Sequence, residues 1–175
     1  MAVKAIMVGG TTSSAGKSLL AMAFCRILAK RGYEVAPFKA QNMSLNSFVT
    51  KNGKEIAIAQ AMQAFSAGIE PDERMNPILL KPKGNFVSQL IVLGEAVCDV
   101  DSREYYKLVP KLKKVVERAY QSLAEEYEVI VIEGAGGMAE INLYERDLAN
   151  IFIARFAKPR IFLVTDIDRG GAFAS

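Results

Sequence analysis

Residues 3–18 read VKAIMVGGTTSSAGKS, and this stretch decides the fold. Its first six residues form a short apolar run that predicts a buried β-strand. A segment rich in glycine, serine and threonine follows, and after Lys17 apolar residues recur at helical spacing up to residue 31. A strand, a glycine-rich turn and a helix in this order are the arrangement of a phosphate-binding loop.

The predicted loop has the features that bind phosphate. Glycines let backbone N–H groups point inward, and the N-terminus of the helix adds positive potential. Lys17 can reach the β- and γ-phosphates of a nucleotide, and the Ser18 hydroxyl can ligate Mg²⁺. Five residues separate Gly10 from Gly16, one more than in the common pattern, and a surface turn with an exposed lysine is the alternative. The residues expected to hold the triphosphate are Gly10, Thr11, Thr12, Ser13, Ser14, Ala15, Gly16, Lys17 and Ser18.

The rest of the chain alternates between strand and helix patterns. Strands are predicted over residues 34–38, 78–81, 89–93, 129–132 and 161–164, and helices over 55–67, from near Ser102 onward, and over 147–156. Helix-length connections between strands predict a mostly parallel sheet with helices on both faces, a three-layer α/β domain of the P-loop type.

Three local features refine this prediction. Pro37 places the second strand at a sheet edge or at its own end. Asp101 and Glu104 can form a capping box, and Pro110 should either kink the following helix or begin a new one. Residues 39–52 are polar and have no period, so they are predicted to be a long loop that is either functional or disordered.

Acidic residues follow two of the apolar strands. Glu133 comes directly after residues 129–132, and Asp166 and Asp168 follow residues 161–164. Ligands of open α/β sheets bind at the carboxyl ends of the strands. A carboxylate is costly to bury there without a cation, and Mg²⁺ is the cation expected beside a phosphate loop. The less favoured alternative for Asp166 and Asp168 is that either one caps the next helix.

Two further charged residues are candidates on similar grounds. Lys39 ends the second strand and can neutralise phosphate or a substrate carboxylate, although it could also be a surface lysine. Glu55 opens the alanine-rich segment, where a metal ligand and an acid that interacts with the helix dipole are equally good interpretations. For Lys81 and for the stripe of Lys107, Lys111, Lys114 and Arg118, the solvent-exposed interpretation is favoured.

Composition excludes several classes of chemistry. The 175 residues contain no histidine, which rules out Ser-His-Asp and Cys-His nucleophiles within this chain and leaves oxygen ligands or two scattered cysteines for a metal. A net charge of +3 is too small to indicate nucleic-acid binding. Neither a membrane span nor a signal peptide is evident, so we expect a soluble, cytoplasmic protein.

At this point the segments GGTTSSAGKS, APFKAQNMSLNS, EIAIAQAMQA, MNPILLKP, EGAGGMAEINL and TDIDRGGAF closely resemble the N-terminal synthetase domain of the glutamine-hydrolysing cobyric acid synthase family. They occur in the family's order and span residues 10–173. The resemblance implies a dethiobiotin-synthetase-like fold. It also implies ATP- and Mg²⁺-dependent amidation of corrinoid carboxylates, from cobyrinic acid a,c-diamide to cobyric acid, by way of acyl phosphates.

The resemblance also implies roles for individual residues. Ser18, Glu55 and Glu133 would hold Mg²⁺, while Lys17 and Lys39 would neutralise the transferred phosphoryl group, with Lys17, Lys39 and Glu133 forming the catalytic set. The corrinoid side chains would lie near Gln41, Asn42, Ser44, Asn46, Asp166 and Asp168. Ammonia would come from glutamine through a C-terminal glutaminase domain that this chain lacks, so residues 1–175 are expected to be one incomplete synthetase domain. A homodimer is left open for its native form.

Two other functions remain open on sequence grounds. One is a related carboxylate-activating enzyme, of the cobyrinic acid a,c-diamide synthase or dethiobiotin synthetase type. The other is a non-enzymatic module that dimerises when it binds ATP. The lack of a lysine among residues 11–15 disfavours the partitioning type of such switches.

Overall fold

A computed structural model describes residues 4–138 and 146–167, so Asp168 lies outside the described residues. Its central sheet has the strand order β10-β1-β9-β2, and all neighbouring strands are parallel. The strands are β1 (Lys4–Gly10), β2 (Val35–Phe38), β9 (Val129–Glu133) and β10 (Arg160–Val164). The sequence-based prediction of a parallel sheet is confirmed, and β2, which contains Pro37, lies at its edge.

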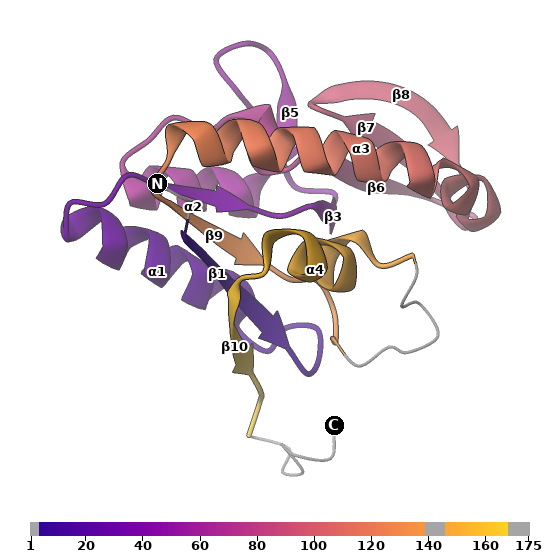
Figure 1. Ribbon diagram of the computed structural model, residues 1–175. Coiled ribbons are helices and arrows are strands. Elements are labelled where there is room, and N and C mark those ends of the chain that lie inside the picture. The colour runs from indigo at the N-terminus through magenta and orange to yellow at the C-terminus, as the bar shows by residue number, and fades with distance from the viewer. Residues whose placement is uncertain (1–3, 139–145, 168–175) are drawn as a thin grey trace.

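Helices cover both faces of this sheet (Figure 1). Side chains of successive strand residues point to opposite faces. Val8, Val35 and Val131 therefore pack against Ala21 and Cys25 of α1 (Lys17–Lys30). The residues between them face α3 (Ser102–Glu126) and the segment formed by η3 (Leu148–Phe152) and α4 (Ile153–Ala157). The predicted three layers are thus present.

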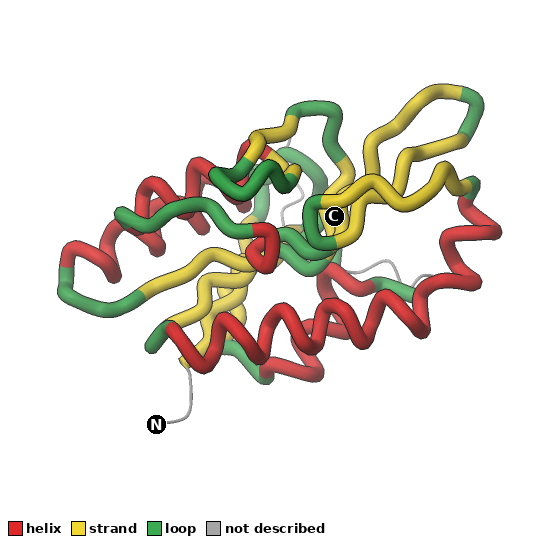
Figure 2. The backbone as a smooth tube through the Cα atoms, turned by 90° about the horizontal axis from the view of Figure 1, so that it is seen from above, coloured by secondary structure: helices red, strands yellow, loops and turns green. Residues whose placement is uncertain are grey.

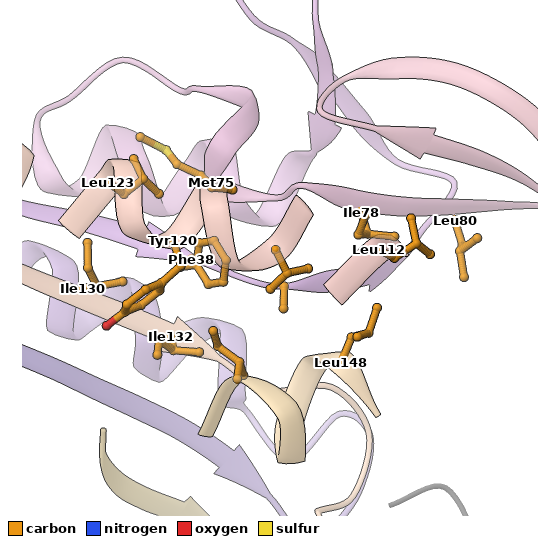
Figure 3. Packing of buried hydrophobic residues seen from close by; sticks show 14 of the residues in the cluster. Phe38, Met75, Ile78, Leu80, Leu112, Tyr120, Leu123, Ile130, Ile132 and Leu148 are labelled. Carbon is orange, nitrogen blue, oxygen red and sulfur yellow. The ribbon is translucent and has the colours of Figure 1, made fainter. Parts of the chain in front are cut away.

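The core on the α3 side is the larger one (Figure 3). Phe38, Ile130 and Ile132 from the sheet meet Tyr120 and Leu123 from α3 there. The rings of Phe38 and Tyr120 are 5.4 Å apart in an edge-to-face arrangement. These contacts fix the ends of β2 and β9, from which two candidate site residues project.

The capping box at the start of α3 is confirmed, because Asp101 accepts from the Glu104 backbone and the Glu104 side chain accepts from the Asp101 backbone. Pro110 does not begin a new helix, since α3 runs as one element through it. Pro110 lies on the exposed side of the helix. Water can therefore satisfy the carbonyl that the missing N–H would have bonded.

A second sheet is the main feature that the sequence did not predict. Its order is β3 (Gln41–Met43), β6 (Ile78–Gly84), β7 (Val87–Val92) and β8 (Glu95–Val100), parallel between β3 and β6 and antiparallel elsewhere. Figure 2 shows these strands extending away from the central sheet, with α3 running beside both. The hairpin between β7 and β8 turns on Leu93 and Gly94, which both have positive φ.

The interpretation of residues 39–52 as one long loop is therefore wrong. That segment holds β3 and also β4 (Ser47–Val49), which pairs with β5 (Glu55–Ala57). Glu55 consequently lies in a strand, and α2 (Ile58–Ala67) begins three residues later. The backbone of this polar segment forms hydrogen bonds with distant strands, and side-chain periodicity cannot predict such pairing.

Among the described residues, no helix is long and apolar enough to span a membrane.

Candidate active site

The site is organised around Glu133, the last residue of β9, which is 1% exposed. Its Oε1 accepts hydrogen bonds from Ser18 Oγ at 2.8 Å and from Lys39 Nζ at 2.7 Å. Its Oε2 accepts from the side-chain amides of Gln60 and Gln63. Four donors thus compensate a carboxylate that would be costly to bury alone.

The fold brings these donors together from three elements. Ser18 lies in the first turn of α1, Lys39 follows β2 directly, and both glutamines lie on α2. Because β1, β9 and β2 are parallel neighbours, their carboxyl ends meet at one edge of the sheet. The structure therefore brings together Ser18, Lys39 and Glu133, which lie far apart in the sequence.

Gln60 and Gln63 were not recognised as site residues from the sequence. Both are fully buried, and their spacing of three residues places them on one face of α2. The signal was present, because two polar side chains on the buried face of an alanine-rich helix need polar partners. The sequence could not show that the partner is Glu133.

The Lys17 side chain bonds to the backbone of its own phosphate loop and of a neighbouring segment. Its Nζ donates to the carbonyl oxygens of Thr12 at 2.7 Å and Gly136 at 2.8 Å. Burial lowers the pKa of Lys17, the nearby Lys39 charge lowers it further, and Glu133 opposes both effects. Lys17 thus links the loop after β1 to the glycine segment after β9, at the edge where Glu133 lies.

Two glycines are needed for this close arrangement. A Cβ on Gly10 would lie 2.8 Å from Lys17 Nζ, and one on Gly137 would lie 2.6 Å from the Thr11 carbonyl oxygen. A side chain at position 137 would therefore force the two loops apart, whereas one at position 10 would displace the Lys17 side chain. Thr11 also donates its backbone N–H to Val164 at the end of β10. The remaining loop residues, Thr12 to Ser18, lead from this contact into α1, for which Gly16 is the N-cap.

The donor set fits Mg²⁺ and a nucleotide phosphate. A hydroxyl and a carboxylate oxygen lie side by side at Ser18 and Glu133, and Mg²⁺ is usually bound by one or two protein oxygens together with substrate phosphates and water. The helix N-terminus and Lys17 offer the donors that phosphate requires. Among the described residues, no group of three acidic or cysteine side chains is arranged as a complete metal cage.

Glu55 is not in contact with this cluster. Its carboxylate pairs with Lys81, which also bonds to Ser47. Burial would raise the pKa of Glu55, but hydrogen bonds from Lys81 and Ser47 outweigh it and the pKa is lowered. Lys81 is therefore more than a surface lysine, since it holds a half-buried carboxylate in place.

Asn76 is a third residue that the sequence did not identify. It is 1% exposed and joins three segments. Its Nδ2 donates to the carbonyl oxygens of Lys39 at 3.1 Å and Ile78 at 3.0 Å, while its Oδ1 accepts from the Ala57 backbone at 3.1 Å. Asn76 thus fixes the backbone of Lys39 relative to the start of α2.

The residues predicted to face the substrate separate into groups. Asn42 donates to Gln60 at 3.0 Å, which connects it to Glu133 through one side chain. Gln41 accepts from the Tyr105 hydroxyl and lines a pocket of about 560 Å³. Ser44 and Asn46 bond to each other in an exposed turn. Asp166 follows β10.

The 560 Å³ pocket connects the phosphate loop region to the second sheet. Gly136, whose carbonyl binds Lys17, lies in its wall together with Gln41 and Tyr105. Asn150 also lines it, and this buried residue bonds to both backbone groups of Ala135. A substrate in this pocket would lie against the glycine segment that follows Glu133.

Comparison with known proteins identifies relatives of the whole chain. The chain is 81% identical over 171 residues to a "Probable cobyric acid synthase" of Archaeoglobus fulgidus, covering 97% of the chain and 37% of that relative. It is 57% identical to a protein of the same name from Methanosarcina barkeri and 54% identical to a "Cobyric acid synthase" of a Nostoc species. The chain thus spans little more than a third of the length of these relatives.

Solved structures support the fold alone. The signal recognition particle receptor FtsY of Elizabethkingia anophelis superposes with a TM-score of 0.52 at 17% identity, covering 97% of this chain and 44% of that one. The complex of that receptor with GDP superposes with a TM-score of 0.53, covering 99% of this chain and 43% of that one.

The model of the family described as "CobQ/CobB/MinD/ParA nucleotide binding domain" matches residues 6–173. The resemblance to cobyric acid synthases is thereby confirmed, and the chain belongs to this nucleotide-binding domain family.

Proposed function

We propose that this chain binds ATP and Mg²⁺ and activates side-chain carboxylates of a corrinoid for amidation, from cobyrinic acid a,c-diamide to cobyric acid in cobalamin biosynthesis. The observation that carries the proposal is the convergence of Ser18, Lys39 and two glutamines on the buried Glu133, beside Lys17 and next to a large pocket. The names of the relatives support the choice of substrate.

The two lysines have distinct tasks in this proposal. Lys17 exchanges the carbonyl oxygens of Thr12 and Gly136 for phosphate oxygens, which are stronger acceptors. Lys39, held by Glu133, neutralises charge between the nucleotide and the carboxylate to be activated. ATP supplies the phosphoryl group that turns this carboxylate into an acyl phosphate, a good electrophile for ammonia. No side-chain nucleophile is needed, so the lack of histidine is no obstacle.

Ser18 and Glu133 are the proposed Mg²⁺ ligands. Gln60 and Gln63 bond to the Oε2 of Glu133, so they keep the carboxylate oriented when Oε1 exchanges its protein donors. Glu55 would join as a ligand only if its pairing with Lys81 opens. Gln41, Asn42, Ser44, Asn46, Asp166 and Asp168 remain the proposed substrate-side residues. Ammonia would normally come from a glutaminase domain that lies beyond residues 1–175.

The proposal is tested by assaying the protein with ATP, Mg²⁺, ammonium and cobyrinic acid a,c-diamide. We expect the wild type to release ADP and to amidate the corrinoid, with the amidated products detected by mass spectrometry. Glu133→Gln and Lys39→Met should each lose most of the ADP release and most of the amidation. Lys51→Met is a matched control, because Lys51 forms only an exposed pair with Glu70. Turnover of diaminopelargonate without turnover of the corrinoid would contradict the proposal. ATP-dependent dimerisation without amidation, seen by light scattering, would instead support a switch.

A further inference from the structure

A cluster of three cations lies beside the main pocket and has no role in the site described above. Arg103, Lys107 and Arg146 surround Tyr106 and together line a second pocket of about 320 Å³. Tyr106 and Arg146 also line the 560 Å³ pocket, so the two spaces adjoin. The second pocket is thus an extension of the proposed substrate site.

Two of the three cations lie on helix α3, and the third stacks on a tyrosine ring of the same helix. Arg103 and Lys107 are four residues apart on α3 and therefore project on the same side of the helix. The guanidinium carbon of Arg146 lies 4.4 Å from the centre of the Tyr106 ring, which is a cation–π contact. This contact positions Arg146 against α3, and within the described parts of the chain no carboxylate pairs with its guanidinium.

The charge of the cluster is not compensated by carboxylates within the described parts of the chain. None of the three cations forms an ion pair with another described residue. The two acids of the main pocket are engaged elsewhere. Asp101 accepts from the Glu104 backbone, and Asp147 accepts from the backbone and side-chain nitrogens of Asn150. The described lining of the second pocket thus contains three cations and no acid.

Resting on the function proposed above, we propose that Arg103, Lys107 and Arg146 bind carboxylates of the corrinoid other than the one being activated. A substrate that is amidated four times presents one carboxylate to Lys39 while the others remain ionised at neutral pH. Each amidation replaces an anion by a neutral amide and so weakens the attraction to the cluster. Affinity should consequently fall with each step, so that the fully amidated product binds most weakly.

The matched control lies on the same helix. Lys111, Lys114 and Arg118 are exposed cations of α3 that line neither of the two pockets. Replacing all three by glutamine removes the same charge as replacing Arg103, Lys107 and Arg146. The control therefore separates a local binding effect from a general change in net charge.

The test measures the dissociation constants of cobyrinic acid a,c-diamide and cobyric acid by calorimetry, at low and high salt. We expect the wild type and the control to prefer the diamide. Each cation removed by Arg103→Gln, Lys107→Gln or Arg146→Gln should reduce that preference about 1.5- to 5-fold, as for an exposed ion pair. Binding of Mg-ATP, measured on the same samples, should be unchanged and shows that the variants are folded.

A wild-type preference for the diamide that persists in the triple glutamine variant would overturn this inference and leave the proposed function intact. The same reduction in the control variant would also overturn it. If the wild type binds Mg-ATP but neither corrinoid, both the inference and the proposed substrate are wrong. These outcomes are distinguished within one set of titrations.

Discussion

Replacing Asn76 by alanine removes the side chain that joins Lys39, Ala57 and Ile78. All three hydrogen bonds are buried, and nothing described nearby can replace the lost amide. Each buried bond contributes about 1 kcal/mol net, and a buried donor left without a partner costs somewhat more. We therefore expect the free energy of unfolding to fall by about 3–5 kcal/mol, a large part of the roughly 5–15 kcal/mol of an ordinary domain.

The assay is urea unfolding followed by circular dichroism, together with calorimetric titration of Mg-ATP. Asn52→Ala is the matched control, because Asn52 lies exposed in a turn, and it should change the stability by less than about 0.5 kcal/mol. Asn76→Asp keeps the acceptor for Ala57 but places a carboxylate against two carbonyl oxygens, so it should destabilise at least as strongly. Wild-type stability and wild-type Mg-ATP affinity in Asn76→Ala would refute the role of Asn76 in positioning Lys39.

Two further predictions concern thiol reactivity and acid stability. Burial raises the pKa of Cys25 to about 12, so a thiol reagent at neutral pH should label only the exposed Cys98 in the native protein and both thiols in urea. Labelling of two thiols without denaturant would contradict the packing of α1. Burial would raise the pKa of Glu55, but the hydrogen bonds from Lys81 and Ser47 outweigh it, so the pKa in the folded protein is below the ordinary value of 4.5. Ionised Glu55 therefore stabilises the fold at pH values above 4.5, and this stabilisation is lost as the pH falls through the lower pKa of the folded state. Glu55→Gln should therefore flatten the acid side of the stability curve, and an unchanged pH dependence would show that the Glu55–Lys81 pair does not stabilise the protein.

The sequence predicts the central sheet well because its signals are local. Each of these signals depends on neighbours within a few residues. Examples are the fully apolar strand over residues 129–132, the glycine-rich turn before Lys17 and the capping box at Asp101. These signals also place Ser18, Lys39 and Glu133 at strand or helix ends on one edge. Parallel topology then brings them into contact.

The second sheet and the partners of Glu133 depend on contacts between distant segments. β3 pairs with a strand almost 40 residues away, and its own residues QNM carry no strand pattern. Asn76 and the two glutamines of α2 are polar residues in apolar surroundings, which signals a buried partner without identifying it. Likewise, the sequence shows Lys107 as part of an exposed stripe, and only the fold separates it from Lys111 by placing it in a pocket.

In the proposed function the loop after β1 binds the phosphates of ATP. Calorimetric titration of Mg-ATP into wild type and Lys17→Ala tests this claim without need of the corrinoid substrate. Loss of one charged hydrogen-bonding group should reduce the binding free energy by roughly 1.5–3 kcal/mol, which corresponds to a dissociation constant about 10- to 150-fold larger. Lys30→Ala, at the exposed far end of α1, controls for the loss of one positive charge and should bind as the wild type does. Equal affinities in wild type and Lys17→Ala would contradict the claim.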